Sequence, residues 1–191
     1  MDQIIVALQA IILSIKQNSV FVFGIIGLLW LLNIINRILS NRLNLLGIIP
    51  RTTHGLIGIF FSPFLHRDFN HLFFNSIPLF VLANLVLLNG RTMFYLVSLM
   101  ITVLSGFSIW VIGRRAIHIG ASSIIMGYFG YLLANAYFQV TATTIILGIL
   151  CIYYFGGLVF NLFPGERDVS WEGHVFGFLA GIATAYWAPY I

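Results

Sequence analysis

The sequence predicts an all-α integral membrane protein, built as a bundle of six transmembrane helices. The first observation is composition: 60% of the 191 residues are apolar, only 7% are charged, and the mean hydropathy is +1.02. Because a soluble domain carries roughly a quarter charged residues, this chain cannot present a water-compatible surface. The second observation is a series of six apolar runs, each long enough or nearly long enough to cross a bilayer.

The first 19 residues are predicted to form a short N-terminal interfacial helix or an extension of the first span. The apolar stretch 3–15 is about 20 Å long as a helix, which is too short for a hydrocarbon core of ~30 Å. Asp2, Gln9 and Lys16 recur every seven residues and form a narrow polar stripe. We therefore divide the chain into an N-terminal segment, 1–19, and a membrane domain, 20–191.

The six predicted spans follow one another along this membrane domain. The first three cover about residues 20–35, 71–88 and 93–112, and the other three cover about 121–138, 144–162 and 174–190. Runs of this length and apolarity are typical of helices that cross a membrane. By parity, the connections after the first, third and fifth spans lie on one side of the membrane.

Two of these connections differ in character. Residues 37–70 are long for a loop in so small a protein and keep apolar pieces at 45–49 and 55–61. We expect this first loop to be partly embedded in the membrane, with its backbone buried against protein. Residues 163–173 are expected to form a water-exposed loop, because they hold four of the fourteen charged residues. These four are Glu166, Arg167, Asp168 and Glu172.

The net charge of +4 comes from nine basic residues against five acidic ones. No basic run with interleaved aromatic residues is present in the sequence, so nucleic-acid binding is not expected. In a membrane protein the excess instead indicates contact with anionic lipid or a topology signal. Seven of the nine basic residues fall on the side of the loops at 37–70, 113–120 and 163–173. The positive-inside rule then predicts that these loops face the cytoplasm.

Polar side chains inside apolar spans are expensive, so their default interpretation is functional. His71 and Asn75 are four residues apart and share one helix face at the start of the second span. Ser122 follows Gly120 at the head of the fourth span, and His174 opens the sixth span. Structural alternatives exist: His71 and Asn75 can cap or hydrogen-bond a neighbouring helix, and Ser122 can bond back to a carbonyl one turn earlier.

Small residues predict which helices meet. Gly177 and Gly181 form a seam of small residues on the same helix face as His174, and such seams let two helices pack closely. Since the fourth and sixth spans start on the same side of the membrane, close packing carries His174 toward Ser122. The matching small residues of the fourth span are Gly127, Gly130 and Ala134.

The chemistry of these groups indicates acyl transfer. A serine hydroxyl is a weak nucleophile at neutral pH and needs an adjacent base. His174 can take the Ser122 proton and return it to the leaving amine. His71, Asn75 and the backbone N–H of Ser122 offer donors for the oxyanion of the tetrahedral intermediate. Because no carboxylate lies in any predicted span, the sequence predicts a dyad of Ser122 and His174.

These residues belong to three motifs that resemble the rhomboid family of intramembrane serine proteases. The motifs are the segment from Gly55 to Asn75, then Gly120-x-Ser122, and finally His174-x-x-Gly177-x-x-x-Gly181. The resemblance covers most of the chain. It implies a rhomboid-like six-helix catalytic domain with a water-filled cavity below the membrane surface.

The family resemblance also implies roles for individual residues. Ser122 and His174 would be catalytic, His71 and Asn75 would help form the oxyanion hole, and His66 would lie at the cavity mouth. The supporting residues would be His66, Gly120, Met126, Gly177 and Gly181. The fifth span and the loop at 163–173 would form a gate for single-span membrane-protein substrates.

No cofactor is implied, and the location would be the bacterial plasma membrane. Family members keep their termini in the cytoplasm and their active site facing outward, which is the reverse of the topology that the arginine count predicts.

Three features depart from the family pattern. Ser123 stands where many members have glycine and adds bulk beside the oxyanion site. Met126 stands where bacterial relatives often have a tyrosine that packs on the histidine, and a thioether orients less firmly. A Trp-Arg pair is missing from the first loop, where Pro50 and Arg51 are found instead.

Other functions fit the sequence less well. A zinc protease needs His-Glu-x-x-His and an aspartyl protease needs two carboxylates within spans, and neither is present in the sequence. A metal site of His66, His71 and His174 lacks any carboxylate or thiol, so no metal is expected. A small transporter predicts paired broken helices and a charge near the midplane. The remaining alternative is a catalytically weak or inactive rhomboid-like protein that binds membrane-protein clients.

Overall fold

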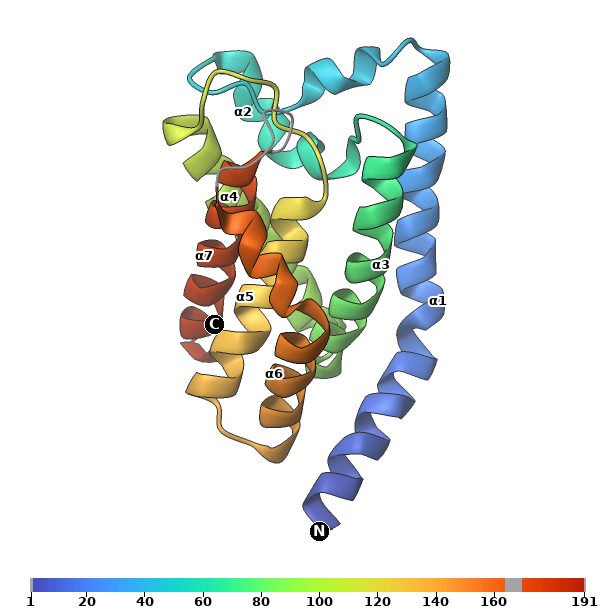
Figure 1. Ribbon diagram of the computed structural model, residues 1–191, viewed down its shortest axis with the longest axis vertical. Coiled ribbons are helices and arrows are strands. Elements are labelled where there is room, and N and C mark those ends of the chain that lie inside the picture. Colours follow the sequence, from blue (N-terminus) through green and yellow to red (C-terminus); the bar gives the residue numbers. More distant parts are fainter. Residues whose placement is uncertain (1, 164–169, 191) are drawn as a thin grey trace.

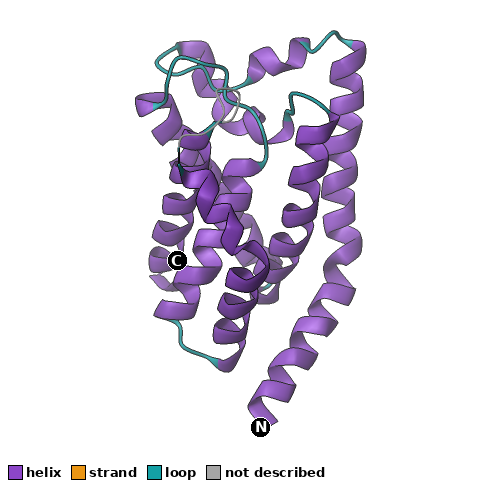
Figure 2. Ribbon diagram, in the orientation of Figure 1, coloured by secondary structure: helices purple, strands orange, loops and turns teal. Residues whose placement is uncertain are grey.

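The structure, a computed structural model, describes residues 2–163 and 170–190, and the elements of this part of the chain are helices joined by loops (Figures 1 and 2). The α-helices are α1 (Asp2–Ile38), α2 (Thr53–Phe61), α3 (Phe69–Val86), α4 (Arg91–Ile112), α5 (Ser122–Phe138), α6 (Ala142–Phe155) and α7 (Trp171–Trp187). Short 3-10 helices join or extend them: η1 (Arg42–Leu46), η2 (Ser62–Phe64), η3 (Leu87–Asn89), η4 (Gly156–Leu162) and η5 (Ala188–Tyr190). The all-α prediction is confirmed.

Among the described residues, four helical segments are long and apolar enough to cross a membrane: α1, α3 with η3, α4, and α6 with η4. The chain is therefore a multi-pass membrane protein. α5 and α7 have 17 residues each, about 26 Å against a hydrocarbon core of ~30 Å. They occupy the positions predicted for the fourth and sixth spans, and the count of six spans stays a prediction.

Helix α1 runs without a break from Asp2 to Ile38, a length of 37 residues. The described part of the segment 1–19 is thus continuous with the first span, in agreement with the second of the two predictions, an extension of that span. A separate interfacial helix is not confirmed. In Figure 1 the N-terminal end of α1 reaches beyond the lower end of the bundle. Ala7 and Ile11 in this part are buried.

Helix α5 lies in the middle of the bundle and α7 packs closely along it (Figure 1). Glycine makes this approach possible. A Cβ placed on Gly177 would overlap the carbonyl oxygen of Ser123, and one on Gly181 would overlap the carbonyl oxygen of Gly127. The structure therefore brings together the seam of small residues that the sequence predicts, and the seam sets how near His174 comes to the start of α5.

The first loop folds against one end of the bundle, at the top of Figure 1, as η1, α2 and η2. Gly58 lies against the carbonyl of Gly47, where any side chain would collide with backbone. Arg51 donates from Nη1 to the carbonyl oxygens of Val111 and Gly113, both at 3.0 Å. A cation is favourable at this position because the carbonyl groups at the C-terminal end of α4 carry partial negative charge.

One charged residue departs from its predicted environment. Glu172 was expected in a water-exposed loop, but it lies in the first turn of α7 and is 4% exposed. Its Oε1 atom is 3.3 Å from Nε of Arg114 and 3.4 Å from the Arg114 backbone nitrogen, which offsets the cost of burial. The prediction was wrong for Glu172. The other three charges, Glu166, Arg167 and Asp168, lie outside the described residues.

Candidate active site

A cavity of about 780 Å³ lies between α3, α5, α7, η4 and the loop that precedes α5. Ser122 lines it from α5, His174 lines it from α7, and His71 and Asn75 line it from α3. Met126, one turn after Ser122, belongs to the same wall. The residues predicted to act as nucleophile, base and oxyanion donors thus converge on one space from three helices.

Ser122 is the first residue of α5. The turn before it is fixed by Gly120, whose N–H donates to the Ser62 carbonyl at 2.9 Å and whose φ of +126° strongly favours glycine. The N–H groups in the first turn of a helix have no intrahelical partner, and the helix dipole makes this end positive. The Ser122 hydroxyl therefore lies beside free backbone donors in a locally positive field.

Gly120 also makes room for the two predicted oxyanion residues. A Cβ at this position would lie 2.8 Å from Cε1 and 3.0 Å from Nε2 of His71, and 3.7 Å from Nδ2 of Asn75. Asn75 is buried, and its Nδ2 atom has no hydrogen-bond partner in the described part of the chain. A buried amide without a partner is costly. Asn75 lines the cavity, so its Nδ2 is available as a donor to a group bound there.

His174 is buried at the start of α7. Its Nδ1 atom lies 2.9 Å from the carbonyl oxygen of Asn161 in η4. A carbonyl oxygen only accepts, so Nδ1 must carry the proton, and the Nε2 atom of the neutral ring is left with a free lone pair. This is the tautomer that a general base needs. The group that orients the ring is a backbone carbonyl, which the sequence could not indicate because every residue has one.

Ser122 and His174 share the cavity wall without a direct hydrogen bond between their described side chains. Catalytic hydrogen bonds are often long in a free enzyme and tighten when substrate is bound. Both side chains therefore line one space of about 780 Å³.

His66 is the predicted site residue whose position was wrong. It was expected at the cavity mouth, but it is fully buried behind His71, with the two ring centroids 5.2 Å apart. Its Nε2 atom accepts from the backbone N–H of Ala121 at 3.4 Å. Burial lowers the pKa of His66 to about 3, so the ring stays neutral and can accept. His66 therefore supports the turn that leads to Ser122.

The start of α3 is held by Asp68. Its Oδ1 atom accepts from the His71 N–H at 2.8 Å as the N-cap, and Oδ2 lies 2.9 Å from Nε of Arg67. The hydrogen bond from His71, followed by that from Arg67, lowers the pKa of Asp68. This cap fixes the first turn of α3, from which the His71 side chain enters the cavity.

Two of the three departures from the family pattern, Met126 and Ser123, lie close to the site. Met126 is 1% exposed and fills the wall below Ser122. Ser123 contributes its carbonyl to the contact with Gly177. The predicted gate is described only in part, because 164–169 lie outside the described residues.

A family model described as Rhomboid domain matches residues 53–190 of the chain. Similar proteins include an uncharacterized protein of Mycobacterium tuberculosis, 36% identical over 170 residues, which covers 84% of this chain and 71% of the relative. An uncharacterized protein of Mycobacterium leprae is 34% identical over 178 residues, covering 88% of this chain and 70% of the relative.

Proposed function

The chain belongs to the rhomboid family, and from this membership we propose that it is an intramembrane serine endopeptidase in which Ser122 is the nucleophile and His174 the general base. The observation that carries the proposal is the convergence of Ser122, His174, His71 and Asn75 on one cavity. Each residue type has an ordinary structural explanation alone. Together, on three helices facing one space, they supply every group that serine proteolysis requires.

The proton path follows from the His174 tautomer. Nε2 of His174 takes the proton from Oγ of Ser122 as Oγ attacks the carbonyl carbon of the scissile bond. The resulting imidazolium gives that proton to the leaving nitrogen, the C–N bond breaks, and an acyl ester remains on Ser122. A water molecule then attacks the acyl carbon and loses a proton to Nε2; the C–Oγ bond breaks, Nε2 returns the proton to Oγ, and the acid product leaves. The carbonyl of Asn161 keeps Nδ1–H directed away from the reacting atoms throughout.

The oxyanion is stabilised by groups that converge near Gly120. Asn75 Nδ2 lacks a partner in the described chain, and His71 lies against the same glycine. The backbone N–H of Ser122, at the N-terminus of α5, is the third donor. Donors held in place before the reaction act strongly because they need no reorganisation as charge develops.

We propose substrates of the kind that the family resemblance implies, single-span membrane proteins cut in or near their transmembrane segments. The cavity lies next to lipid-facing helices, so a substrate helix would reach it sideways and must unwind locally. The relatives are bacterial proteins, which supports the bacterial plasma membrane as the location.

The test is cleavage of a panel of single-span reporters by the purified protein in proteoliposomes. Wild type is expected to cleave at least one reporter, and Ser122→Ala and His174→Ala are expected to abolish cleavage. The matched control is Ser123→Ala, which removes the neighbouring hydroxyl and should retain activity. Cleavage by all four proteins alike contradicts the proposal. Stable reporter binding without cleavage by wild type would instead favour a client-binding protein.

A further inference from the structure

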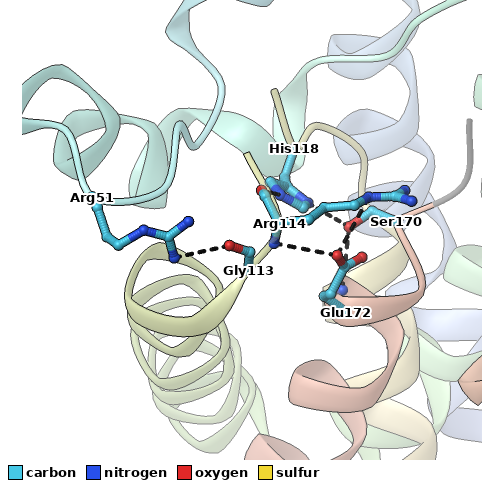
Figure 3. Close-up of polar contacts among 7 residues, drawn as sticks. Arg51, Gly113, Arg114, His118, Ser170 and Glu172 are labelled. Carbon is cyan, nitrogen blue, oxygen red and sulfur yellow. Dashed lines mark hydrogen bonds and ion pairs between the residues drawn. The ribbon is translucent and has the colours of Figure 1, made fainter. Parts of the chain in front are cut away.

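A second serine and histidine lie beside the proposed dyad, and these two are hydrogen-bonded (Figure 3). Oγ of Ser170 is 2.7 Å from Nδ1 of His118. His118 precedes Ser122 by four residues, and Ser170 precedes His174 by four residues. The pair therefore joins the two segments from which the proposed nucleophile and base project.

The direction of this hydrogen bond follows from its surroundings. Nε2 of His118 lies 3.0 Å from the carbonyl oxygen of Arg114, so Nε2 carries the proton and Nδ1 accepts from the Ser170 hydroxyl. Burial lowers the pKa of His118, which keeps the ring neutral. Ser170 Oγ also accepts from the Gly173 N–H at 3.2 Å as the N-cap of α7. Both side chains thus take part in hydrogen bonds that tie the N-cap of α7 to the segment leading into α5.

The His118 side of the pair is anchored to the first loop. His118 and Ile48 exchange two backbone hydrogen bonds of 2.9 and 3.0 Å, and Gly120 donates to Ser62. His118 is 3% exposed and Ile48 is 2% exposed. The segment leading into α5 is therefore held by contacts that do not involve Ser170, and α7 can be positioned against it.

A second contact joins the same two segments. Glu172, in the first turn of α7, accepts from the backbone N–H of Arg114 and pairs with its guanidinium (Figure 3). The first turn of α7 is thus bound to the segment 114–118 through two side chains, two residues apart in sequence. His174 follows Ser170 by four residues, about one helical turn, and both residues line the cavity.

We propose that His118 and Ser170 are positioning residues, whose hydrogen bond holds the first turn of α7 against the segment leading into α5 and so sets the separation of His174 from Ser122. This inference rests on the proposed function of that dyad. A misplacement of about 1 Å lowers the rate of an oriented reaction by roughly 100-fold. Loss of the bond should therefore reduce turnover without weakening substrate binding in the cavity.

The variants are His118→Leu, which removes both ring hydrogen bonds, and Ser170→Gly, which removes the hydroxyl but remains an acceptable N-cap. Ser170→Thr, which keeps the hydroxyl, is the matched control. In proteoliposomes we expect kcat to fall about 10- to 100-fold in the first two variants, with KM nearly unchanged, and Ser170→Thr to resemble wild type. If His118→Leu fails to fold, Ser170→Gly provides the same test.

A second readout is independent of proteolysis. Hydrogen exchange in the first turn of α7, measured in a Ser122→Ala background, should be faster with His118→Leu or Ser170→Gly and unchanged with Ser170→Thr. Unchanged exchange in all variants overturns the contact as a positioning device, even if the wild type proves inactive. If the wild type is active and the two variants exchange faster but keep the wild-type kcat, the contact does not affect the dyad, and that part of the proposal is overturned. Inactivity of the wild type with faster exchange instead contradicts only the proposed function.

Discussion

The backbone carbonyl of Asn161 accepts a hydrogen bond from Nδ1 of His174 at 2.9 Å, so that η4 fixes the orientation and tautomer of a ring carried by α7. In a Ser-His-Asp triad a buried carboxylate has this place. A carbonyl carries no full charge and stabilises the imidazolium less. The proposed mechanism accordingly relies more on the position of His174 than on its basicity, and four predictions test the groups that set the geometry and charge of the site.

Asn75→Ala should lower kcat by about 100- to 1000-fold, because it removes a donor to the oxyanion. Stability should change little, since Nδ2 has no partner to lose within the described chain. Reporter cleavage and thermal unfolding in detergent measure the two effects. The control is Asn84→Ala on the same helix, where Nδ2 donates to the Phe80 carbonyl at 2.8 Å. Asn84→Ala should lower stability and spare kcat; the opposite pattern would contradict the assigned role of Asn75.

Gly120→Ala should abolish cleavage, because the new methyl group would meet the His71 ring while the backbone is strained at a φ of +126°. Gly90→Ala is the matched control: its φ is +89°, and no atom of the described residues lies within 4 Å of the added Cβ. Both changes should destabilise by roughly 1–3 kcal/mol through backbone strain, and the overlap with His71 adds to the cost for Gly120→Ala. Only Gly120→Ala should lose activity, and equal activity of the two variants would show that the space beside His71 is not needed.

Gly181→Ala should destabilise the bundle by more than about 2 kcal/mol, since the Cβ would overlap the Gly127 carbonyl and force α7 away from α5. The control is Gly27→Ala in α1, where the added Cβ has no neighbour within 4 Å in the part of the chain that the structure describes. Because alanine is the better helix former, Gly27→Ala should be neutral or slightly stabilising. Unfolding of both variants in detergent decides the matter, and a fully stable Gly181→Ala would contradict the close packing of α5 and α7.

Asp68 gives a pH dependence with a definite sign. The pKa of its carboxyl is lowered in the folded protein, so its contribution is present above the unfolded value of about 3.9 and is lost as the pH falls through the folded value. Wild type should lose stability in that acidic range more steeply than Asp68→Asn, which keeps the N-cap without a charge. Thermal unfolding from pH 6 down to pH 2 measures this loss, which should be about 1 kcal/mol, the usual contribution of an N-cap. Parallel curves of stability against pH for wild type and Asp68→Asn would show that Asp68 does not cause the acid loss of stability.

Much of this arrangement was predictable because it depends on residue type and helical spacing. The apolar runs predicted the helices, and Gly177 and Gly181 predicted the packing partner of α7. Ser122, His174, His71 and Asn75 could be proposed because polar groups in apolar spans are rare.

What could not be predicted depends on backbone atoms or on burial. Asn161 acts through a carbonyl that every residue possesses. Glu172 belongs to a charged stretch, and only its contact with Arg114 explains its burial. His66 was misplaced because sequence spacing does not indicate which ring of two neighbouring histidines faces the cavity and which lies behind it.

The central claim is that His174 activates the Ser122 hydroxyl within the cavity, and reaction with a fluorophosphonate probe tests it most directly. Peptide mapping of the labelled protein in detergent should find the probe on Ser122 in wild type and in Ser123→Ala. It should find none in His174→Ala, provided that thermal unfolding shows this variant to be folded. Labelling at another serine, or labelling of Ser122 at an equal rate without His174, would contradict the account.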